Sequence, residues 1–279
     1  MATSVFDLGA HTYVDEGDLL DPGEGPEAAA ITQALVGTDR PTLGYLVISA
    51  DVDFLRLYGP QWFSFAALLQ TEGLGLVIAV IGPGDEVTRL IEQSREMIAR
   101  IGRFRHEDGG RTADAVIFVP LPDPRTPEAK TYYACARHLI ALPLIEATGA
   151  PVLIVDADQA VEKSVEPFVR GLARHDVGVI GARGLGGIWP WRRHMAGSGW
   201  FNATLGGQAV LRTIGRYIRA NLHRAPSWTL DQNAVSFALE AHPEATLHID
   251  GSSASPFIQP SVRSQQEKLW RARKAAMAA

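Results

Sequence analysis

The stretch Pro151-Val152-Leu153-Ile154-Val155-Asp156-Ala157-Asp158 decides the fold and points to the site. An apolar run of this length, rich in β-branched residues, predicts a buried strand that ends at two carboxylates. Side chains alternate in direction along a strand, so Asp156 and Asp158 point the same way and can converge on one cation or substrate. Two anions this close repel each other unless something positive lies between them. An Asp-x-Asp after a strand is also an ordinary polar start to a loop.

Strand and helix patterns alternate around this stretch. Strands are predicted at 42–49, 74–81, 115–120, 152–155 and 177–181, and helices at 60–70, 86–101, 127–148 and 165–174. Such alternation predicts an α/β domain with a mainly parallel sheet flanked by helices. Binding chemistry gathers at the carboxyl ends of the strands, where Asp51 and Asp53 also fall.

The remaining segments set the domain boundaries. Glycines predict a loop at 182–200, followed by helices at 208–223 and 229–241 and a strand at 245–249. Acidic residues interspersed with Gly and Pro make 1–40 a loosely ordered lead-in. We therefore expect one domain at 41–260, with a basic helical tail at 261–279.

Composition excludes several classes of protein. A net charge of -5 does not suggest a nucleic-acid binder. The single cysteine, Cys135, excludes an internal disulfide and a thiolate metal site. Residues 1–10 lack a secretory pattern, and the longest apolar stretches, near 74–82 and 139–155, are too short or interrupted to span a membrane. A cytoplasmic protein is the simplest expectation.

Three chemistries use a strand that ends in Asp-x-Asp. One binds a nucleotide sugar through a divalent cation. The second is a phosphatase of the haloacid-dehalogenase type, with Asp156 as the nucleophile. About four strand-helix units precede the motif and residue 160 is Ala, which both weaken that interpretation. The third, dinucleotide binding, needs a glycine fingerprint that Gly82-Pro83-Gly84 does not complete.

Several further motifs follow one another in a family-like order. They are Tyr132-Tyr133, Arg137, Val152–Asp158, Trp200-Phe201-Asn202-Ala203, Asp231-Gln232 and His248-Ile249-Asp250-Gly251. Over residues 42–257 the chain resembles nucleotide-diphospho-sugar transferases of the GT-A fold, and is most similar to glycosyltransferase family 8, the glycogenin and galactosyltransferase type. The resemblance implies a single GT-A domain with a mainly parallel sheet.

The resemblance also implies a donor site with a metal. Asp51, or its neighbour Asp53, would contact the nucleobase, and Arg137 would reach the donor. Asp156 would bind ribose and metal, with Asp158 and His248 as further metal ligands. Hard oxygen ligands favour Mg²⁺ or Mn²⁺, and the added imidazole favours Mn²⁺.

For the transferred sugar, the resemblance implies roles for Asn202, Asp231 and Gln232. One departure concerns the leaving group: Gly251-Ser252-Ser253-Ala254-Ser255-Pro256-Phe257 lacks the lysine of the family's Lys-Pro-aromatic motif. The cations that remain for the leaving phosphate lie in the 182–200 segment, and are Arg183, Arg192, Arg193 and His194.

The resulting expectation is a metal-dependent, retaining hexosyltransferase that uses a nucleotide-sugar donor, with UDP as the expected nucleotide. The acceptor, a glycan, protein or lipid, and the oligomeric state do not follow from the sequence. A basic tail around Leu269 and Trp270 would suit an anionic membrane surface, although a solvated helix explains it more simply. The alternatives are the phosphatase and a domain that binds a nucleotide sugar or glycan without turnover.

Overall fold

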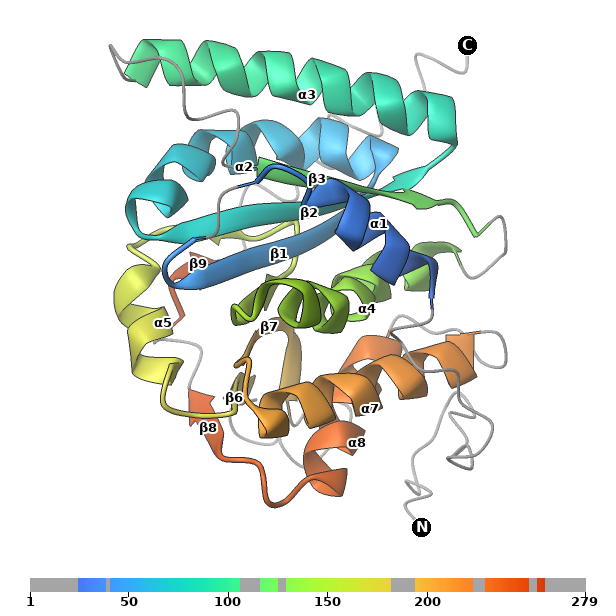
Figure 1. Ribbon diagram of the computed structural model, residues 1–279, viewed down its shortest axis with the longest axis vertical. Helices are drawn as coiled ribbons and strands as arrows, with labels where there is room; N and C mark the ends of the chain where they lie inside the picture. Colours follow the sequence, from blue (N-terminus) through green and yellow to red (C-terminus); the bar gives the residue numbers. More distant parts are fainter. Residues whose placement is uncertain are drawn as a thin grey trace.

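A mixed sheet forms the centre of the molecule (Figure 1). The computed structural model describes residues 25–38, 41–105, 116–124, 129–181, 194–222, 229–250 and 255–258. Within them, seven strands pair in the order β3-β2-β1-β4-β7-β6-β8. The strands are β1 (Gly44–Asp51), β2 (Leu74–Gly82), β3 (Val116–Pro122), β4 (Val152–Val155), β6 (Val177–Gly181), β7 (His194–Phe201) and β8 (Leu247–Asp250).

All neighbouring strands are parallel except at β7, which runs antiparallel to both β4 and β6. A small second sheet pairs β5 (Ala160–Val161) with β9 (Phe257–Ile258). The central strands are buried on both faces, so they are continuous apolar runs rather than alternating ones. The predicted α/β domain with a mainly parallel sheet is confirmed.

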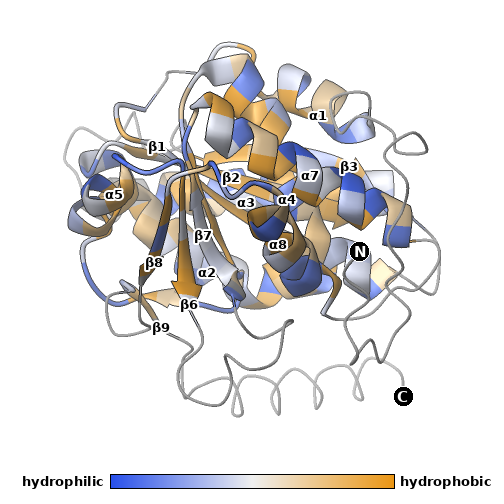
Figure 2. Cartoon of the chain, turned by 90° about the horizontal axis from the view of Figure 1, so that it is seen from below, coloured by the Kyte–Doolittle hydropathy of each residue, from blue (hydrophilic) through white to orange (hydrophobic). Residues whose placement is uncertain are grey.

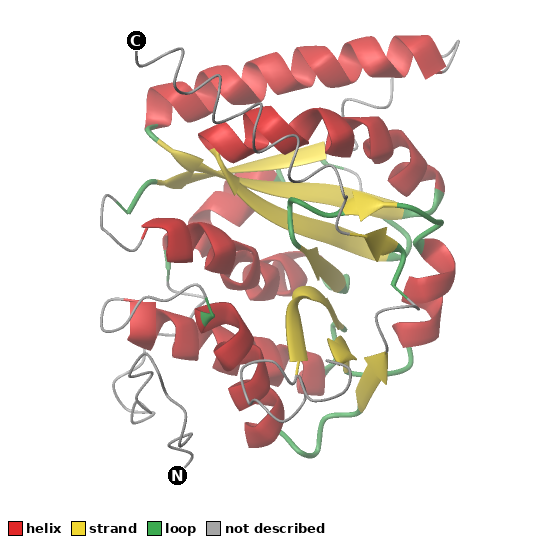
Figure 3. Cartoon of the chain, turned by 180° about the vertical axis from the view of Figure 1, so that it is seen from behind, coloured by secondary structure: helices red, strands yellow, loops and turns green. Residues whose placement is uncertain are grey.

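Helices cover both faces of the sheet (Figures 1 and 3). One face packs against α1 (Pro26–Ala34), α4 (Ala129–Thr148), α7 (Leu205–Leu222) and α8 (Leu230–Ala241). The other packs against α2 (Val52–Thr71), α3 (Gly84–Arg105) and α5 (Glu166–Leu172). Alternation along β1 sends Val47 into the first core and Ile48 into the second. Figure 2 shows the apolar residues gathered along the strands and on the helix faces that cover them. No helix in the described ranges is long and apolar enough to cross a membrane.

The structure corrects three of the predicted boundaries. Residues 26–34, expected in the loosely ordered lead-in, form α1, whose Ile31 is buried in the core. The helix expected at 60–70 starts at Val52, because Asp51 caps it and Pro60 is accommodated inside it. Residues 194–200, expected in a loop, belong to β7. Residues 1–24, 182–193 and 261–279 lie outside the described part of the chain.

Candidate donor site at the carboxyl end of the sheet

A buried arginine holds the leading carboxylate of the Asp-x-Asp motif. In β4, Val152 and Ile154 point into the core beneath α4. Side chains two positions apart on a strand point the same way, so Asp156 also points toward α4. There Nη2 of Arg137, on α4, lies 2.7 Å from Oδ1 of Asp156 and 2.8 Å from Oδ2 of Asp231 on α8. Three of the predicted site residues therefore meet in one cluster, although they are far apart in sequence.

Burial sets the electrostatics of this cluster. Only 4 % of Arg137 is exposed, and burial alone would lower the pKa of its guanidinium. Asp156 and Asp231 outweigh that penalty and raise the pKa. Burial also raises the pKa of Asp231 to about 6, against the attraction of Arg137 and with the repulsion of Asp156. One buried cation therefore lies between two carboxylates and offsets part of their mutual repulsion.

The turn after β4 is held by residues that the sequence did not single out. The indole Nε1–H of Trp62 donates to the carbonyl of Ala157 at 2.8 Å. The side-chain amide of Gln61 donates to the carbonyl of Gln159, also at 2.8 Å. The hydroxyl of Ser198 donates to Oε1 of Gln159 at 3.0 Å. The only sequence signal was Trp62 itself, because a buried indole N–H needs a partner.

Gly197 lets β7 pass close to Asp156. A Cβ at this position would collide with Oδ2 of Asp156 and lie 3.2 Å from Nε2 of Gln159. The carbonyl of Gly197 also accepts the backbone N–H of Asp156 at 2.9 Å. Glycines predicted a loop at 182–200. At position 197, however, the glycine allows β7 to lie close to the end of β4.

The remaining carboxylates of the predicted site lie at the same edge of the sheet. Asp158 is buried, and it contributes to raising the pKa of Arg137. Asp51, at the end of β1, caps α2 by accepting the N–H of Phe54 at 2.6 Å. Asp53 is close to Arg56, with 3.3 Å between Oδ1 and Nη1. Because β1 and β4 are adjacent parallel strands, their carboxyl ends bring these groups to one edge of the sheet.

A tyrosine faces these carboxylates from α4. Burial, followed by Asp123, Asp51 and Asp53, raises the pKa of Tyr133. The carbonyl of Tyr133 accepts the hydroxyl of Ser49, in β1, at 2.6 Å. A phenol therefore lies close to the carboxylates at the carboxyl end of β1.

Asn202 does not join the cluster. The antiparallel β7 carries it to the opposite edge, because Gly197 lies beside Asp156 and Phe201 pairs with Val152. Asn202 is five residues beyond Gly197, and at the usual rise of an extended strand this places it roughly 16 Å from Gly197 along β7. Its amide donates to the carbonyls of Ala173 and His175, at 2.8 and 3.3 Å. The predicted contact with a donor sugar is wrong for this arrangement, where Asn202 fastens the segment between α5 and β6.

His248 is also distant from Asp156 and Asp158. His248 in β8 pairs with Gly178 in β6. Gly178 pairs in turn with Trp200 in β7, and Trp200 pairs with Leu153 in β4. His248 is thus three strands from β4, roughly 14 Å at the usual strand spacing, and it stacks on His175 with ring centroids 4.9 Å apart. The described strand register therefore contradicts its predicted place beside the carboxylate pair.

Two further predicted groups are described. Gln232 lies half-buried next to Asp231, whose Oδ1 accepts the N–H of Gln232 at 2.8 Å. His194, one of the cations considered for the leaving group, is buried with Nδ1 3.3 Å from the hydroxyl of Ser236. Arg183, Arg192 and Arg193 lie outside the described residues.

The donor set of this site suits a metal only if a substrate contributes ligands. Among the described residues no group of three or more His, Cys, Asp and Glu side chains is arranged to hold a metal ion. Asp156 and Asp158 supply carboxylate oxygen, and His248 lies elsewhere. Mg²⁺ in nucleotide sites is commonly held by one or two carboxylates together with phosphate oxygens and water. The two carboxylates fit that arrangement and do not form a site on their own.

No protein-family model and no curated protein matches the chain. Solved structures of similar shape include the glycosyltransferase GlyE of Streptococcus pneumoniae TIGR4, at 12% identity and a TM-score of 0.42 over 75% of this chain and 45% of that one. The bifunctional glycosyltransferase WbbM matches at 15% identity and 0.46, over 77% and 40%. The galactosyltransferase LgtC, in complex with donor and acceptor sugar analogues, matches at 14% and 0.47, over 80% and 82%. The chain thus spans less than half of GlyE and WbbM, and these likenesses carry no inference about its chemistry.

Proposed function

We propose that this chain is a GT-A-type glycosyltransferase that moves a hexose from a nucleoside-diphosphate sugar, with UDP as the expected nucleotide, to an acceptor. The observation that carries the proposal is the buried Arg137 held between Asp156 and Asp231. It joins the Asp-x-Asp turn to the start of α8. The family resemblance assigns the first segment to the donor's ribose and the metal, and the second to the transferred sugar.

The topology supports a nucleotide site at this place. From β1 the chain proceeds to β2 and β3 on one side, while β4 lies on the other side of β1. This reversal creates a crevice outside the carboxyl ends of β1 and β4, which is where open α/β sheets bind their ligands. Asp51, Asp53, Asp156 and Asp158 follow those two strand ends. The candidate carboxylates therefore occupy the crevice that the strand order selects.

The proposed roles follow from this placement. Asp51 or Asp53 would accept N–H groups of the nucleobase, and Asp156 would contact the ribose. Arg137 keeps Asp156 and Asp231 oriented, while Asp231 and Gln232 would bind the hexose near its anomeric carbon. Transfer breaks the bond between the anomeric carbon and the phosphate oxygen and forms one to the acceptor oxygen. The acceptor's proton leaves with the departing phosphate, and the retention of configuration implied by the resemblance belongs to the same proposal.

A divalent cation also belongs to the proposal. Asp156 and Asp158 would hold it together with the donor's diphosphate, and Mg²⁺ fits this all-oxygen set better than Mn²⁺ because His248 does not reach it. When bound, it would neutralise charge on the departing phosphate. Asp158 would then matter for nucleotide binding only when the metal is present.

Thermal unfolding with and without ligands tests the proposal. We expect UDP with Mg²⁺ to raise the melting temperature more than UDP alone or GDP with Mg²⁺, because a ligand that binds only the folded state stabilises it. Asp158→Asn should keep the fold and lose the metal-dependent part of the shift. Asp85→Asn, on the exposed first turn of α3, is the matched control.

Activity assays separate the remaining alternatives. Release of UDP from UDP-hexose in the wild type, lost in Asp158→Asn, supports the transferase. Binding without turnover would indicate a nucleotide-sugar binding domain. Hydrolysis of a phosphomonoester without any response to nucleotides would favour the phosphatase and exclude the transferase.

A further inference from the structure

A second hollow lies on the opposite face of the sheet from Arg137 and Asp231. It has a volume of about 510 Å³, and its lining includes Lys163, Phe168, Gly171, Arg174, His248 and Pro256. Figure 1 shows the two elements that frame it, α5 and the edge strand β8, next to each other at the same end of the molecule. Its volume is within the usual range for small-molecule sites, so it can hold a ligand of one or two sugar rings.

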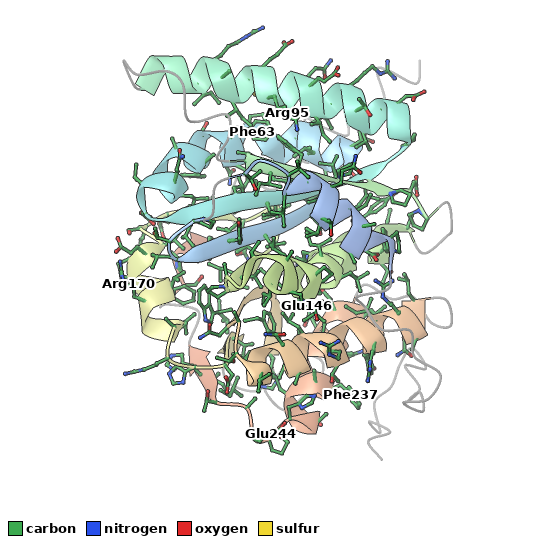
Figure 4. The ribbon with its side chains drawn as sticks, viewed as in Figure 1. Phe63, Arg95, Glu146, Arg170, Phe237 and Glu244 are labelled. Carbon is green, nitrogen blue, oxygen red and sulfur yellow. The ribbon has the colours of Figure 1, made fainter. Side chains whose placement is uncertain are left out.

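The hollow is lined by cations without a matching acid. Lys163 precedes α5 and Arg174 follows it, and none of the described residues that line the hollow is acidic. In the described part of the chain neither side chain pairs with a carboxylate. Two nearby acids are engaged elsewhere: Glu166 binds Arg170 at 2.7 Å, and Asp176 holds Thr204 and Thr246. Figure 4 labels Arg170 on α5 at the edge of the molecule.

The two cations are suitably spaced for one elongated ligand. They flank α5, which at seven residues is roughly 10 Å long. Phe168, on α5 between them, and Pro256, whose carbonyl accepts the N–H of Glu162 at 2.9 Å, offer apolar surfaces for the C–H face of a sugar ring. His248, whose ring stacks on His175, adds a hydrogen-bonding group at the Arg174 end. The lining thus combines charge at its ends with an apolar middle.

Gly171 is one of the residues that line the hollow. It lies within α5, where glycine weakens a helix by roughly 0.5–1 kcal/mol relative to alanine. A Cβ at Gly171 would meet nothing within 4 Å, and its backbone has no conformation that requires glycine. Neither packing nor backbone strain therefore calls for glycine at this position. What its missing side chain provides is room in the hollow.

We propose that this hollow, formed by α5 and β8, is a binding site for an anionic saccharide of about two rings that carries a phosphate or carboxylate. The acidic group would lie against Lys163 or Arg174, and a ring against Phe168. The site does not depend on the proposed transferase activity, because the Asp156 cluster lies on the other face of the sheet. Phosphate and carboxylate are two sources of the same chemistry, and the experiment distinguishes them.

Calorimetric titration of the full chain tests the site with three probes of similar size. These are maltose 1-phosphate, digalacturonate and, as the neutral reference, maltose. We expect one or both anionic probes to bind at least tenfold more tightly than maltose. Arg174→Ala or Lys163→Ala should weaken that binding about tenfold, because a hydrogen bond to a charged group contributes about this much. Arg100→Ala, an exposed cation on α3, should leave it unchanged.

Two glycine substitutions provide a control for folding. Gly171→Leu should abolish binding of the anionic probe by filling the hollow, whereas Gly84→Leu, where a Cβ also meets nothing within 4 Å, should not. Both variants should keep the wild-type response to UDP, so this test is separate from that of the donor site. Equal binding of maltose, unchanged binding in Gly171→Leu, or no binding of either anionic probe at millimolar concentration would overturn the proposal.

Discussion

At the scale of single residues, the proposed donor site contains a counterion, Arg137, that two carboxylates share. Arg137 has two carboxylate partners, and one of them, Asp231, is almost completely buried. Removing one partner from a buried ion pair usually costs more than the pair contributes, because the other charge stays buried. The cluster is therefore a point where stability and function are coupled.

The pH dependence of stability should reveal the burial of Asp231. Its pKa rises from 3.8 to about 6 on folding, because burial disfavours the anion. The folded state therefore binds the proton of Asp231 more tightly than the unfolded state does. The stability that this adds is fully present below pH 3.8 and is lost as the pH rises through 6. Asp231→Asn cannot titrate, so the free energy of unfolding of the wild type minus that of the variant should fall between about pH 4 and 6 and then level off.

Urea unfolding at pH 4, 5, 6 and 7 measures that difference. The half-buried Asp53→Asn variant is the reference for a carboxylate outside the cluster. If the difference instead increased with pH, the attraction of Arg137 would outweigh burial and the pKa of Asp231 would be lowered on folding rather than raised.

Gly197→Ala should damage nucleotide binding without unfolding the protein. The added Cβ would displace the carboxylate of Asp156 from its position beside Arg137. We expect at least a tenfold loss of affinity for UDP with Mg²⁺, or about 1.4 kcal/mol. Gly199→Ala is the matched control, because its Cβ would meet the Phe201 ring, at 3.1 Å, and not Asp156. Equal affinities of the two variants would argue against a role for Asp156 in the nucleotide site.

At the scale of elements, α1 is held to the domain by a buried carboxylate. Glu27 is 1 % exposed, and Oε1 accepts the hydroxyl of Tyr132 on α4 at 3.0 Å. Oε2 accepts Nη2 of Arg219 on α7 at 2.5 Å. Burial and then Glu27 raise the pKa of Tyr132, which therefore remains a proton donor to this carboxylate. One side chain thus joins three helices.

Glu27→Ala should therefore loosen α1. It leaves Arg219 and Tyr132 without their shared acceptor, and we expect a loss of about 3 kcal/mol in the free energy of unfolding, at the low end for a buried pair because Arg219 is partly exposed. Urea unfolding measures the loss, and hydrogen exchange should show faster exchange in α1. Thr32→Ala, on the exposed side of the same helix, should cost far less. Similar losses in the two variants would show that Glu27 does not anchor α1.

The elements also show what sequence patterns can and cannot predict. The strands at 152–155 and 177–181 were predicted to the residue, because buried parallel strands are continuous apolar runs. β7 was missed because its glycines favoured a loop, whereas Gly197 allows β7 to approach Asp156 closely. Asn202 was misplaced for a related reason, since a sequence pattern does not give the direction of a strand. The meeting of Arg137, Asp156 and Asp231 followed only from the family resemblance, because no local pattern links residues so far apart.

At the scale of the whole molecule, the sheet joins the two cores. Along β1 successive residues, such as Val47 and Ile48, belong to opposite cores. Losing a strand would therefore expose both cores, which predicts one cooperative unfolding transition. The proposed donor site, on one face, and the hollow beside α5, on the other, would then be lost together in one unfolding transition.

A pair of substitutions on opposite faces tests this coupling. Leu144→Ala in α4 and Leu69→Ala in α2 each remove a fully buried side chain, one from each core, and each should cost about 2–5 kcal/mol. In both variants, hydrogen exchange in the slowest amides of α4 and of α2 should accelerate by the same factor, because these amides exchange only through global unfolding. Leu68→Ala, at a partly exposed position beside Leu69, should change neither helix appreciably. Acceleration confined to the substituted face would show that the two cores unfold independently, so that binding at one site would not stabilise the other.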